Sequence, residues 1–293
     1  MKKLICIALS AALALTLTAC GGNAEENNGS AALSGTVSTD GSTSMEKVVG
    51  GLGEMFMEMN SGITFTYNPT GSGSGIKAVQ ESRCDIGLAS RNLKAEEAQS
   101  GLTETVLAYD GIAVIVNPEN PVSDLDVATI AKIYLGQITN WSEVGGKHQK
   151  IRPFQRAENS GSQTSLQKLM AGLPLMDPEE EARIAGMGGI IREVASYRNY
   201  KNAIGFSFRY YSTEMVRNGD IRLLALNGVE PTRETIRDGS YPIASEFYAV
   251  TSSPIGAPAP QETNTHIAAF LDWILSPEGQ TIIEKTGYVG IHP

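Results

Sequence analysis

The chain has 293 residues, of which 41% are hydrophobic and 19% are charged, and its formal net charge at pH 7 is −9. This length is enough for two domains of ordinary size. The acidic balance argues against nucleic-acid binding, which relies on a basic surface that neutralises phosphates. Any anion bound by this chain must therefore be held by local dipoles and a few donors, against the overall field.

The N-terminus is typical of an export signal. A basic head precedes an apolar run over residues 4–17, which is too short to span a bilayer as a stable anchor. The run ends in Leu-Thr-Ala-Cys at Cys20, which resembles the lipobox of bacterial lipoproteins. We expect residues 1–19 to be removed as a signal peptide and Cys20 to carry lipid; a plain signal peptide with a chance cysteine is the alternative. Residues 20–33 are small, polar and acidic, as in a flexible tether.

The cysteines predict an exported chain without an internal disulfide. Of the three, Cys6 lies in the signal and Cys20 takes the lipid, which leaves only Cys84. The exported chain must then be held together by its hydrophobic core.

A strand is predicted over residues 34–38, and the polar turn Gly41-Ser42-Thr43-Ser44 follows it closely. The next apolar residues recur at helical spacing: Met45, Val48, Val49, Leu52, Met55, Phe56 and Met59. The first N–H groups of a helix have no internal partner, and the helix dipole places partial positive charge there. The turn therefore opens a helix start that can bind an oxyanion.

A second turn of this kind follows the strand predicted over residues 63–67. The stretch TGSGSG at residues 70–75 lets the backbone approach a ligand closely, adds hydroxyl donors and precedes a predicted helix. It is not a P-loop, because Ile76 separates Gly75 from Lys77, and it is not a hydrolase elbow, because Gly73 occupies the nucleophile position. Taken alone, this turn is weak evidence for a site.

Further along, residues 84–91 form a predicted strand that runs into a loop with Ser90 and Arg91 at its tip. A buried strand is predicted over residues 112–118 and a helix over residues 127–135, closed by a glycine. Another strand, over residues 151–154, leads directly into the most informative stretch of the chain.

That stretch is RAENSGSQTS at residues 156–165, which reads as a helix start because apolar residues at helical spacing follow it. Its asparagine and serines can cap the helix. Arg156 supplies a planar guanidinium that matches two oxygens of a tetrahedral anion, and Glu158 can hold it in place. The alternative is an ordinary capped surface helix, and on this stretch alone the two interpretations are about even.

Later strands are predicted over residues 203–208, 221–226 and 246–250. Two C-terminal helices follow, the second with Ser276 as its cap and Pro277 at its first position. Alternating strands and helices predict an α/β protein with parallel sheets, whose ligand crevice lies at the carboxyl ends of strands.

The sequence offers no pattern for catalysis or metal binding. His148, His266 and His292 are scattered outside these turns, and neither a His-Glu-x-x-His motif nor a paired-cysteine spacing occurs. We therefore expect a binding protein without metal or cofactor, rather than an enzyme.

Taken in order, the motifs resemble those of the substrate-binding lipoproteins of bacterial high-affinity phosphate ABC transporters. They are GSTS at residues 41–44, TGSGSG at 70–75, DIGLASR at 85–91, DGIAVIVNP at 110–118, LGQITNW at 135–141, RAENSGSQTSL at 156–166 and SPEGQ at 276–280. The resemblance implies an α/β, two-lobe fold of the type II periplasmic-binding-protein kind, with two chain crossings at the hinge and the ligand in the interlobe cleft. It implies that lobe 1 comprises residues 34–110 and 246–293, and lobe 2 residues 111–245.

The same resemblance implies that phosphate takes hydrogen bonds from hydroxyls, main-chain N–H groups and one arginine. The matching positions here are Thr43, Ser44, Ser72, Ser90, Arg156, Ser160, Gly161 and Ser162, with Ser74 as a further candidate.

One position departs from the pattern of the family. Some members have an aspartate after the serine that matches Ser90, and that carboxylate accepts the proton of the bound anion. Here the residue is Arg91, a candidate ligand that would favour full anions and blur phosphate against sulfate. Asp110, at the predicted crossing, is our candidate for the missing acceptor; the alternative is a hinge or capping aspartate that never touches ligand.

The function implied by the resemblance is capture of inorganic phosphate by a monomeric, extracytoplasmic lipoprotein anchored to the cell membrane. The protein would deliver phosphate to the permease and ATPase of an ABC importer. An exported phosphatase that uses the same anion cradle is the alternative from another class. A third interpretation keeps the fold and changes the ligand to sulfate, molybdate or a phosphonate.

Overall fold

The computed structural model describes residues 33–195, 200–214, 220–252 and 265–292. The predicted signal peptide, the lipid site Cys20 and all but the last residue of the predicted tether lie outside these residues. Within the described part of the chain, none of the helices combines the length and the apolar character needed to cross a bilayer.

The first three strands are parallel and alternate with helices, as the sequence predicts. β1 (Ser34–Gly41) lies between β2 (Gly62–Asn68) and β3 (Ile86–Ala89). A short 3₁₀ turn, η1 (Thr43–Met45), and helix α1 (Glu46–Met59) follow β1, whereas helix α2 (Ser72–Gln80) follows β2. Most of the predicted apolar stripe of α1 is buried, namely Val48, Val49, Leu52 and Phe56, whereas Met55 and Met59 are exposed.

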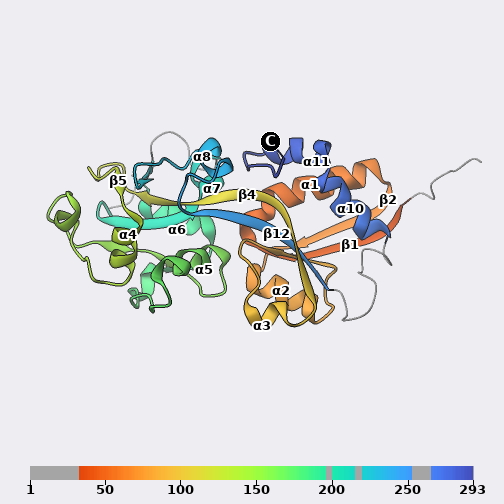
Figure 1. Ribbon diagram of the computed structural model, residues 1–293, viewed down its shortest axis with the longest axis horizontal. Coiled ribbons are helices and arrows are strands. Elements are labelled where there is room, and N and C mark those ends of the chain that lie inside the picture. Colours follow the sequence, from red (N-terminus) through yellow and green to blue (C-terminus); the bar gives the residue numbers. More distant parts are fainter. Residues whose placement is uncertain (1–32, 196–199, 215–219, 253–264, 293) are drawn as a thin grey trace, which may run out of the picture. The chain divides into compact units, whose positions relative to one another are not determined.

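Two long strands join the two halves of one mixed sheet: the first half contains β1, β2 and β3, and the second half contains the strands of this sheet that lie between the two long ones in the sequence. β4 (Leu102–Val116) and β12 (Ala244–Ser252) run antiparallel to each other, and β12 is also antiparallel to β3. The expectation of purely parallel sheets is therefore wrong at the centre. The chain leaves the first half through β4 and returns through β12, so the two strands must point in opposite directions. Figure 1 shows them side by side between the two groups of elements.

β4 changes its partner along its length. Its residues from Leu102 to Gly111 pair with β12, and those from Ile112 to Val116 pair with β9 (Ala203–Phe208). The strand order is β2-β1-β3-β12-β4-β9-β6, and β10 (Arg222–Leu223) adds to β4. The change of partner falls beside Asp110, where the sequence predicts the first chain crossing; the lobe boundaries themselves stay a prediction.

The second half contains the stretch that leads to the third helix start. β6 (Arg152–Pro153) and β7 (Gln155–Arg156) precede α5 (Gly161–Gln167), and β7 pairs with β8 (Arg183–Ile184). The remaining elements of this half are α4 (Val127–Tyr134), η2 (Trp141–Val144), η3 (Lys168–Met170), η4 (Glu180–Ala182), α6 (Met187–Val194), α7 (Arg209–Glu214), α8 (Arg233–Arg237) and the pair β5 (Asp124–Leu125) with β11 (Ala225–Leu226).

The C-terminal helices close the core of the first half. Ser276 caps α11 (Pro277–Lys285) by accepting a hydrogen bond from the Gly279 amide, as predicted, and α10 (Thr265–Leu275) precedes it. Figure 1 shows α1, α10 and α11 on one side of β1, with α2 and the short α3 (Ala95–Ala98) on the other. The first half is thus a sheet covered by helices on both faces.

We predict that Phe270→Ala lowers the free energy of unfolding by about 3–5 kcal/mol, the usual cost of emptying a buried aromatic site. The Phe270 side chain is 1% exposed and its ring lies 5.1 Å from that of Phe56 and 5.3 Å from that of Phe65. Urea unfolding measures the change. Leu173→Ala, at a side chain that is 55% exposed, is the control and should change stability by less than about 0.5 kcal/mol. Equal effects of the two substitutions would contradict the packing described here.

Candidate functional site

A small cavity of about 50 Å³ lies where the Gly- and Ser-rich turns meet. Eight predicted site residues line it: Thr43, Ser44, Ser72, Ser90, Arg156, Ser160, Gly161 and Ser162. Five further residues line it as well: Ser42, Thr70, Gly71, Asn159 and Ala185. The first four of these five belong to the quoted motifs, so their signal was present in the sequence. Ala185 carries no such signal, because only the pairing of β7 with β8 brings it to the site.

The first turn carries β1 into the cavity wall. Gly41 has φ +136°, and a Cβ built there would lie 2.2 Å from the carbonyl oxygen of Leu88, so only glycine allows β1 to end this close to β3. The Oγ atoms of Ser42 and Ser44 lie 2.7 Å apart and both side chains are buried. Ser42 Oγ also donates to Ser90 Oγ at 3.2 Å. The turn is therefore tied to the loop after β3 through hydroxyl groups.

The second turn adds the start of α2. Gly71, with φ +105°, precedes the helix, and Ser72 is its first residue. Ser72 Oγ accepts a hydrogen bond from the Ser90 amide at 3.1 Å and lies 3.2 Å from Ser90 Oγ. The Gly73 amide donates to the carbonyl oxygen of Asn159 at 3.4 Å, which links this turn to the third one.

The third turn places the start of α5 against the other two. Ser160 is the N-cap residue, and its Oγ lies 2.9 Å from that of Ser162. At Gly161 an added Cβ would lie 2.0 Å from Ser90 Oγ and 2.7 Å from Ser72 Oγ. Glycine is therefore required here because two hydroxyls of the other turns occupy the space beside its backbone.

Arg156 brings a buried positive charge to the cavity. Its side chain is 2% exposed, its Nη2 donates to the Ala185 carbonyl oxygen at 2.9 Å, and its amide donates to Gln163 Oε1 at 2.8 Å. Burial lowers the pKa of Arg156 to about 10, because desolvation disfavours the charged form. The guanidinium stays protonated at neutral pH, and an anion beside it would relieve this penalty. Glu158, expected to hold it, is exposed and lines a neighbouring groove.

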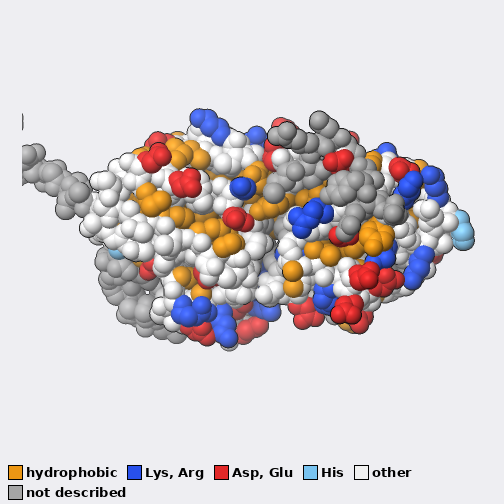
Figure 2. Space-filling model, turned by 180° about the vertical axis from the view of Figure 1, so that it is seen from behind, with side chains coloured by type: hydrophobic (Ala, Val, Ile, Leu, Met, Phe, Trp, Pro, Cys, Tyr) orange, Lys and Arg blue, Asp and Glu red, His pale blue; other side chains and the backbone are white. Residues whose placement is uncertain are grey.

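The described residues that line the cavity include no carboxylate and no histidine. Hydroxyls, backbone groups, an amide and one guanidinium remain, a set suited to a small oxyanion. In the described part of the chain, no three side chains of His, Cys, Asp or Glu come together as metal ligands could. On the face shown in Figure 2, acidic and basic side chains are interspersed.

Arg91 does not line this cavity. Its Nη1 and Nη2 donate to the two carboxylate oxygens of Glu97 at 2.7 and 2.8 Å, and Nη1 also reaches the Asn92 carbonyl oxygen at 2.8 Å. The pair is bidentate and its charge is compensated within the loop. Arg91 is thus not among the residues that meet at the cavity, and its contact with the anion stays a prediction. Ser74 also lies outside the cavity and lines the neighbouring groove.

Asp110 lies at the point where β4 changes its partner. Its side chain is buried, Oδ1 accepts from the Gly111 amide at 2.8 Å, and Oδ2 accepts from the Tyr210 amide at 3.2 Å. It does not line the cavity. The Asp110 side chain links the point where β4 changes partner to the first turn of α7. Its role as anion acceptor stays a prediction.

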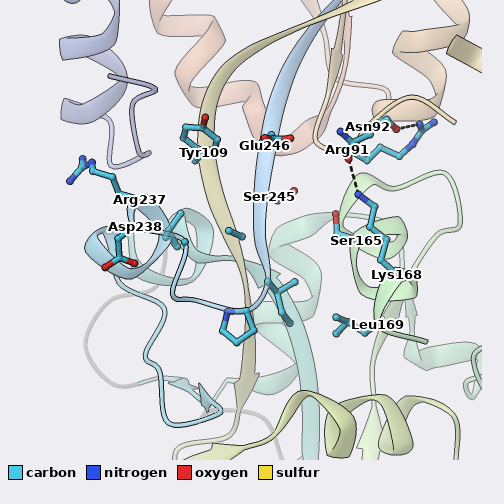
Figure 3. Close-up of a pocket in the computed structure, with 15 residues that line it drawn as sticks. Arg91, Asn92, Tyr109, Ser165, Lys168, Leu169, Arg237, Asp238, Ser245 and Glu246 are labelled. Atoms are coloured by element: carbon cyan, nitrogen blue, oxygen red, sulfur yellow. Dashed lines mark hydrogen bonds between the residues drawn. The ribbon is translucent and has the colours of Figure 1, made fainter. Parts of the chain in front are cut away.

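A wider groove, of about 540 Å³, lies beside the site and is drawn in Figure 3. Ser165 and Ser245 both donate to the Ser90 carbonyl oxygen, at 3.5 and 3.3 Å, and so separate this groove from the cavity. Figure 3 shows Lys168 reaching toward the opposite segment, where its Nζ donates to Asn92 Oδ1 at 2.9 Å. The groove contains charges of both signs, so it lacks the concentrated positive potential of the smaller cavity.

Known proteins with similar sequences also include anion-binding proteins. A family model described as a PBP superfamily domain matches residues 26–278. The phosphate-binding protein PstS of Borreliella burgdorferi is 30% identical over 259 residues, which is 87% of this chain and 90% of the relative. That of Bacillus subtilis is 28% identical over 303 residues, covering 99% and 94%.

Solved structures agree with these relatives. A putative phosphate ABC transporter substrate-binding protein with bound phosphate, from Clostridium perfringens, is 34% identical with a TM-score of 0.77 and covers 88% of this chain and 100% of its own. An ABC-type phosphate transport receptor from Vibrio cholerae is 26% identical with a TM-score of 0.72, over 87% and 100%. The fold and the cavity define a substrate-binding protein of the periplasmic-binding type. The chain belongs to the PBP superfamily and, within it, to the family of the phosphate-binding proteins PstS.

We predict a pH-dependent effect of Asp110→Asn on stability. Burial raises the pKa of Asp110 to about 7, whereas an unfolded aspartate titrates near about 3.9. Between these pH values the folded state holds a proton that the unfolded state has released, so this group makes stability fall as pH rises. Relative to the wild type, the variant should therefore gain stability between about pH 4 and 7, on the order of a few kcal/mol. Urea unfolding at several pH values measures this, and parallel pH curves for the two proteins would contradict the buried titration.

Proposed function

We propose that this protein is an extracytoplasmic receptor that captures inorganic phosphate and delivers it to the membrane permease of an ABC transporter. The observation that carries the proposal is the convergence of three hydroxyl-rich turns and the buried Arg156 guanidinium on one cavity of about 50 Å³. The relatives named phosphate-binding protein, and the related structure that holds phosphate, support the same ligand.

The proposed ligands of phosphate are Thr43, Ser44, Ser72, Ser90, Arg156, Ser160, Gly161 and Ser162. Hydrogen bonds to a charged group contribute about 1.5–3 kcal/mol each, so seven or eight of them, after ordering costs, allow micromolar affinity or better. A serine or threonine hydroxyl can accept as well as donate a hydrogen bond. The lining can therefore take the proton of a monohydrogen phosphate without a carboxylate.

Binding without turnover is the proposed activity. A hydrolase would need a general base within reach of a nucleophilic hydroxyl, and the described residues that line the cavity supply no histidine or carboxylate for this role. Turnover of a chromogenic phosphate ester would instead favour the phosphatase alternative. Sulfate, molybdate and phosphonates are the remaining competitors, and calorimetric titration of each against phosphate separates them.

The proposed motion is closure of two lobes, residues 34–110 with 246–293 and residues 111–245, around the anion. The change of partner along β4 beside Asp110 supports this division, because the hinge can bend there without breaking either set of strand pairs. Lipid on Cys20 would keep the monomer near its permease. One acyl chain binds a membrane only marginally, so we expect more than one.

Gly161→Ala should weaken phosphate binding by about 10- to 100-fold, because the added methyl group would overlap with the hydroxyls of Ser90 and Ser72 and force the turns apart. Isothermal titration calorimetry measures the loss. Gly50→Ala is the matched control, since nothing lies within 4 Å of a Cβ built at that position. Unchanged affinity in Gly161→Ala would mean that phosphate binds elsewhere.

Replacing each buried arginine by glutamine should distinguish an arginine that binds phosphate from one that stabilises the fold. Arg156→Gln should lower phosphate affinity by about 100-fold or more, while phosphate-free stability stays the same or rises, because burial already disfavours this charge. Arg91→Gln should keep phosphate affinity and lower stability, because it removes the bidentate pair with the partly buried Glu97 carboxylate. Calorimetry and urea unfolding of both variants test the assignment, and a loss of affinity in Arg91→Gln would restore Arg91 as a ligand.

A further inference from the structure

Three tyrosine hydroxyls hold the backbone of the first turn. They donate to three successive carbonyl oxygens at 2.5, 2.7 and 2.5 Å: Tyr67 to Ser42, Tyr211 to Thr43 and Tyr288 to Ser44. Each carbonyl dipole is thereby turned toward a phenol. A carbonyl oxygen facing the cavity would repel an anion, so this arrangement leaves the hydroxyls and amides of the turn to line it.

The three tyrosines come from different parts of the chain. Tyr67 lies on β2 and Tyr288 follows α11, both in the proposed first lobe, which also contains the turn. Tyr211 lies on α7, in the proposed second lobe. Its bond to the turn therefore crosses the interface between the lobes, whereas the other two bonds stay within one lobe.

Helix α7 packs beside Asp110, at the proposed hinge. The amide of Tyr210, the residue before Tyr211, donates to Asp110 Oδ2 at 3.2 Å. The ring of Tyr210 stacks on that of Tyr288, with centroids 4.2 Å apart and planes inclined by 23°. The position of Tyr211 is thus set by the bend of β4 and by packing against the first lobe.

We propose that Tyr211 is a positioning residue that couples lobe closure to the first anion-binding turn. Its hydroxyl holds the Thr43 carbonyl only when the lobes are together, and it thereby completes the turn and retards the escape of the anion. This inference deepens the proposed function and rests on it.

The buried hydroxyl of Ser165 also bonds across the proposed lobes, but to the Ser90 carbonyl oxygen and not to the first turn. The exposed contacts between the proposed lobes are less suited to this task. Lys168 reaches Asn92 in an exposed setting, and Arg237 pairs with Glu284 where the two side chains are 39% and 29% exposed. Such contacts compete with water and salt and contribute little. The Tyr211 side chain is buried, and burial raises its pKa well above the ordinary value, so the hydroxyl remains a donor at physiological pH.

The test compares Tyr211→Phe with Tyr67→Phe and Tyr288→Phe, which remove the same group from the same turn. Stopped-flow measurement of phosphate binding and release gives both rate constants. In Tyr211→Phe we expect dissociation to be about three- to tenfold faster, with association changed less than about twofold. The two controls should not show this selective effect on dissociation, because their bonds exist whether the lobes are open or closed.

Each outcome has a distinct meaning. If the wild type fails to bind phosphate, the proposed function is wrong. If it binds and Tyr211→Phe releases phosphate at the wild-type rate, the coupling is wrong and the function stands. If phosphate dissociation were accelerated to a similar extent in all three variants, Tyr211 would only stabilise the turn, and the coupling would be wrong. Urea unfolding without phosphate checks the fold of each variant, and Tyr210 keeps α7 seated in Tyr211→Phe.

Discussion

Recognition in this protein depends on concentrating positive potential in one buried cavity of an acidic chain. The net charge of −9 disfavours an anion at long range, so attraction must come from groups at hydrogen-bond distance. The guanidinium of Arg156 and the opening amides of α2 and α5 are such groups. Burying a charge and backbone donors costs free energy, and an oxyanion placed beside them offsets part of that cost. The rest of the fold serves to bring these groups together.

The mixed sheet achieves this by sending the chain out through β4 and back through β12. Because β4 pairs with β12 up to Gly111 and with β9 from Ile112, one strand belongs to both halves of the molecule. The first two turns and the Ser90 loop come from the first half, and the Arg156 stretch comes from the second. A small bend near the change of partner would therefore move one set of donors against the other while leaving each half intact.

Arg91 and Arg156 show why charge and motif alone do not define a ligand. Arg91 closely follows β3 and Arg156 ends β7, and both side chains are almost fully buried. Glu97 lies six residues after Arg91, on the short helix α3, and accepts hydrogen bonds from both Nη atoms of its guanidinium. Arg156 instead donates to a backbone carbonyl and faces the cavity. A cation paired with a carboxylate stabilises the local structure, whereas a guanidinium that lines a cavity without a carboxylate can attract an anion.

The sequence by itself determined the local elements: the strand at Ala203–Phe208, the cap at Ser276, and the turns that open α1, α2 and α5. It also determined the order of motifs that indicates the family, because hydrophobic period, capping and turn chemistry are set by neighbours a few residues apart. Only the tertiary structure decided that β12 runs antiparallel, that Asp110 accepts a hydrogen bond from the Tyr210 amide, and that Tyr211 and Tyr288 hold carbonyls 168 and 244 residues away. Those outcomes depend on which strands pair and on the direction in which each side chain then points, and a local sequence pattern determines neither.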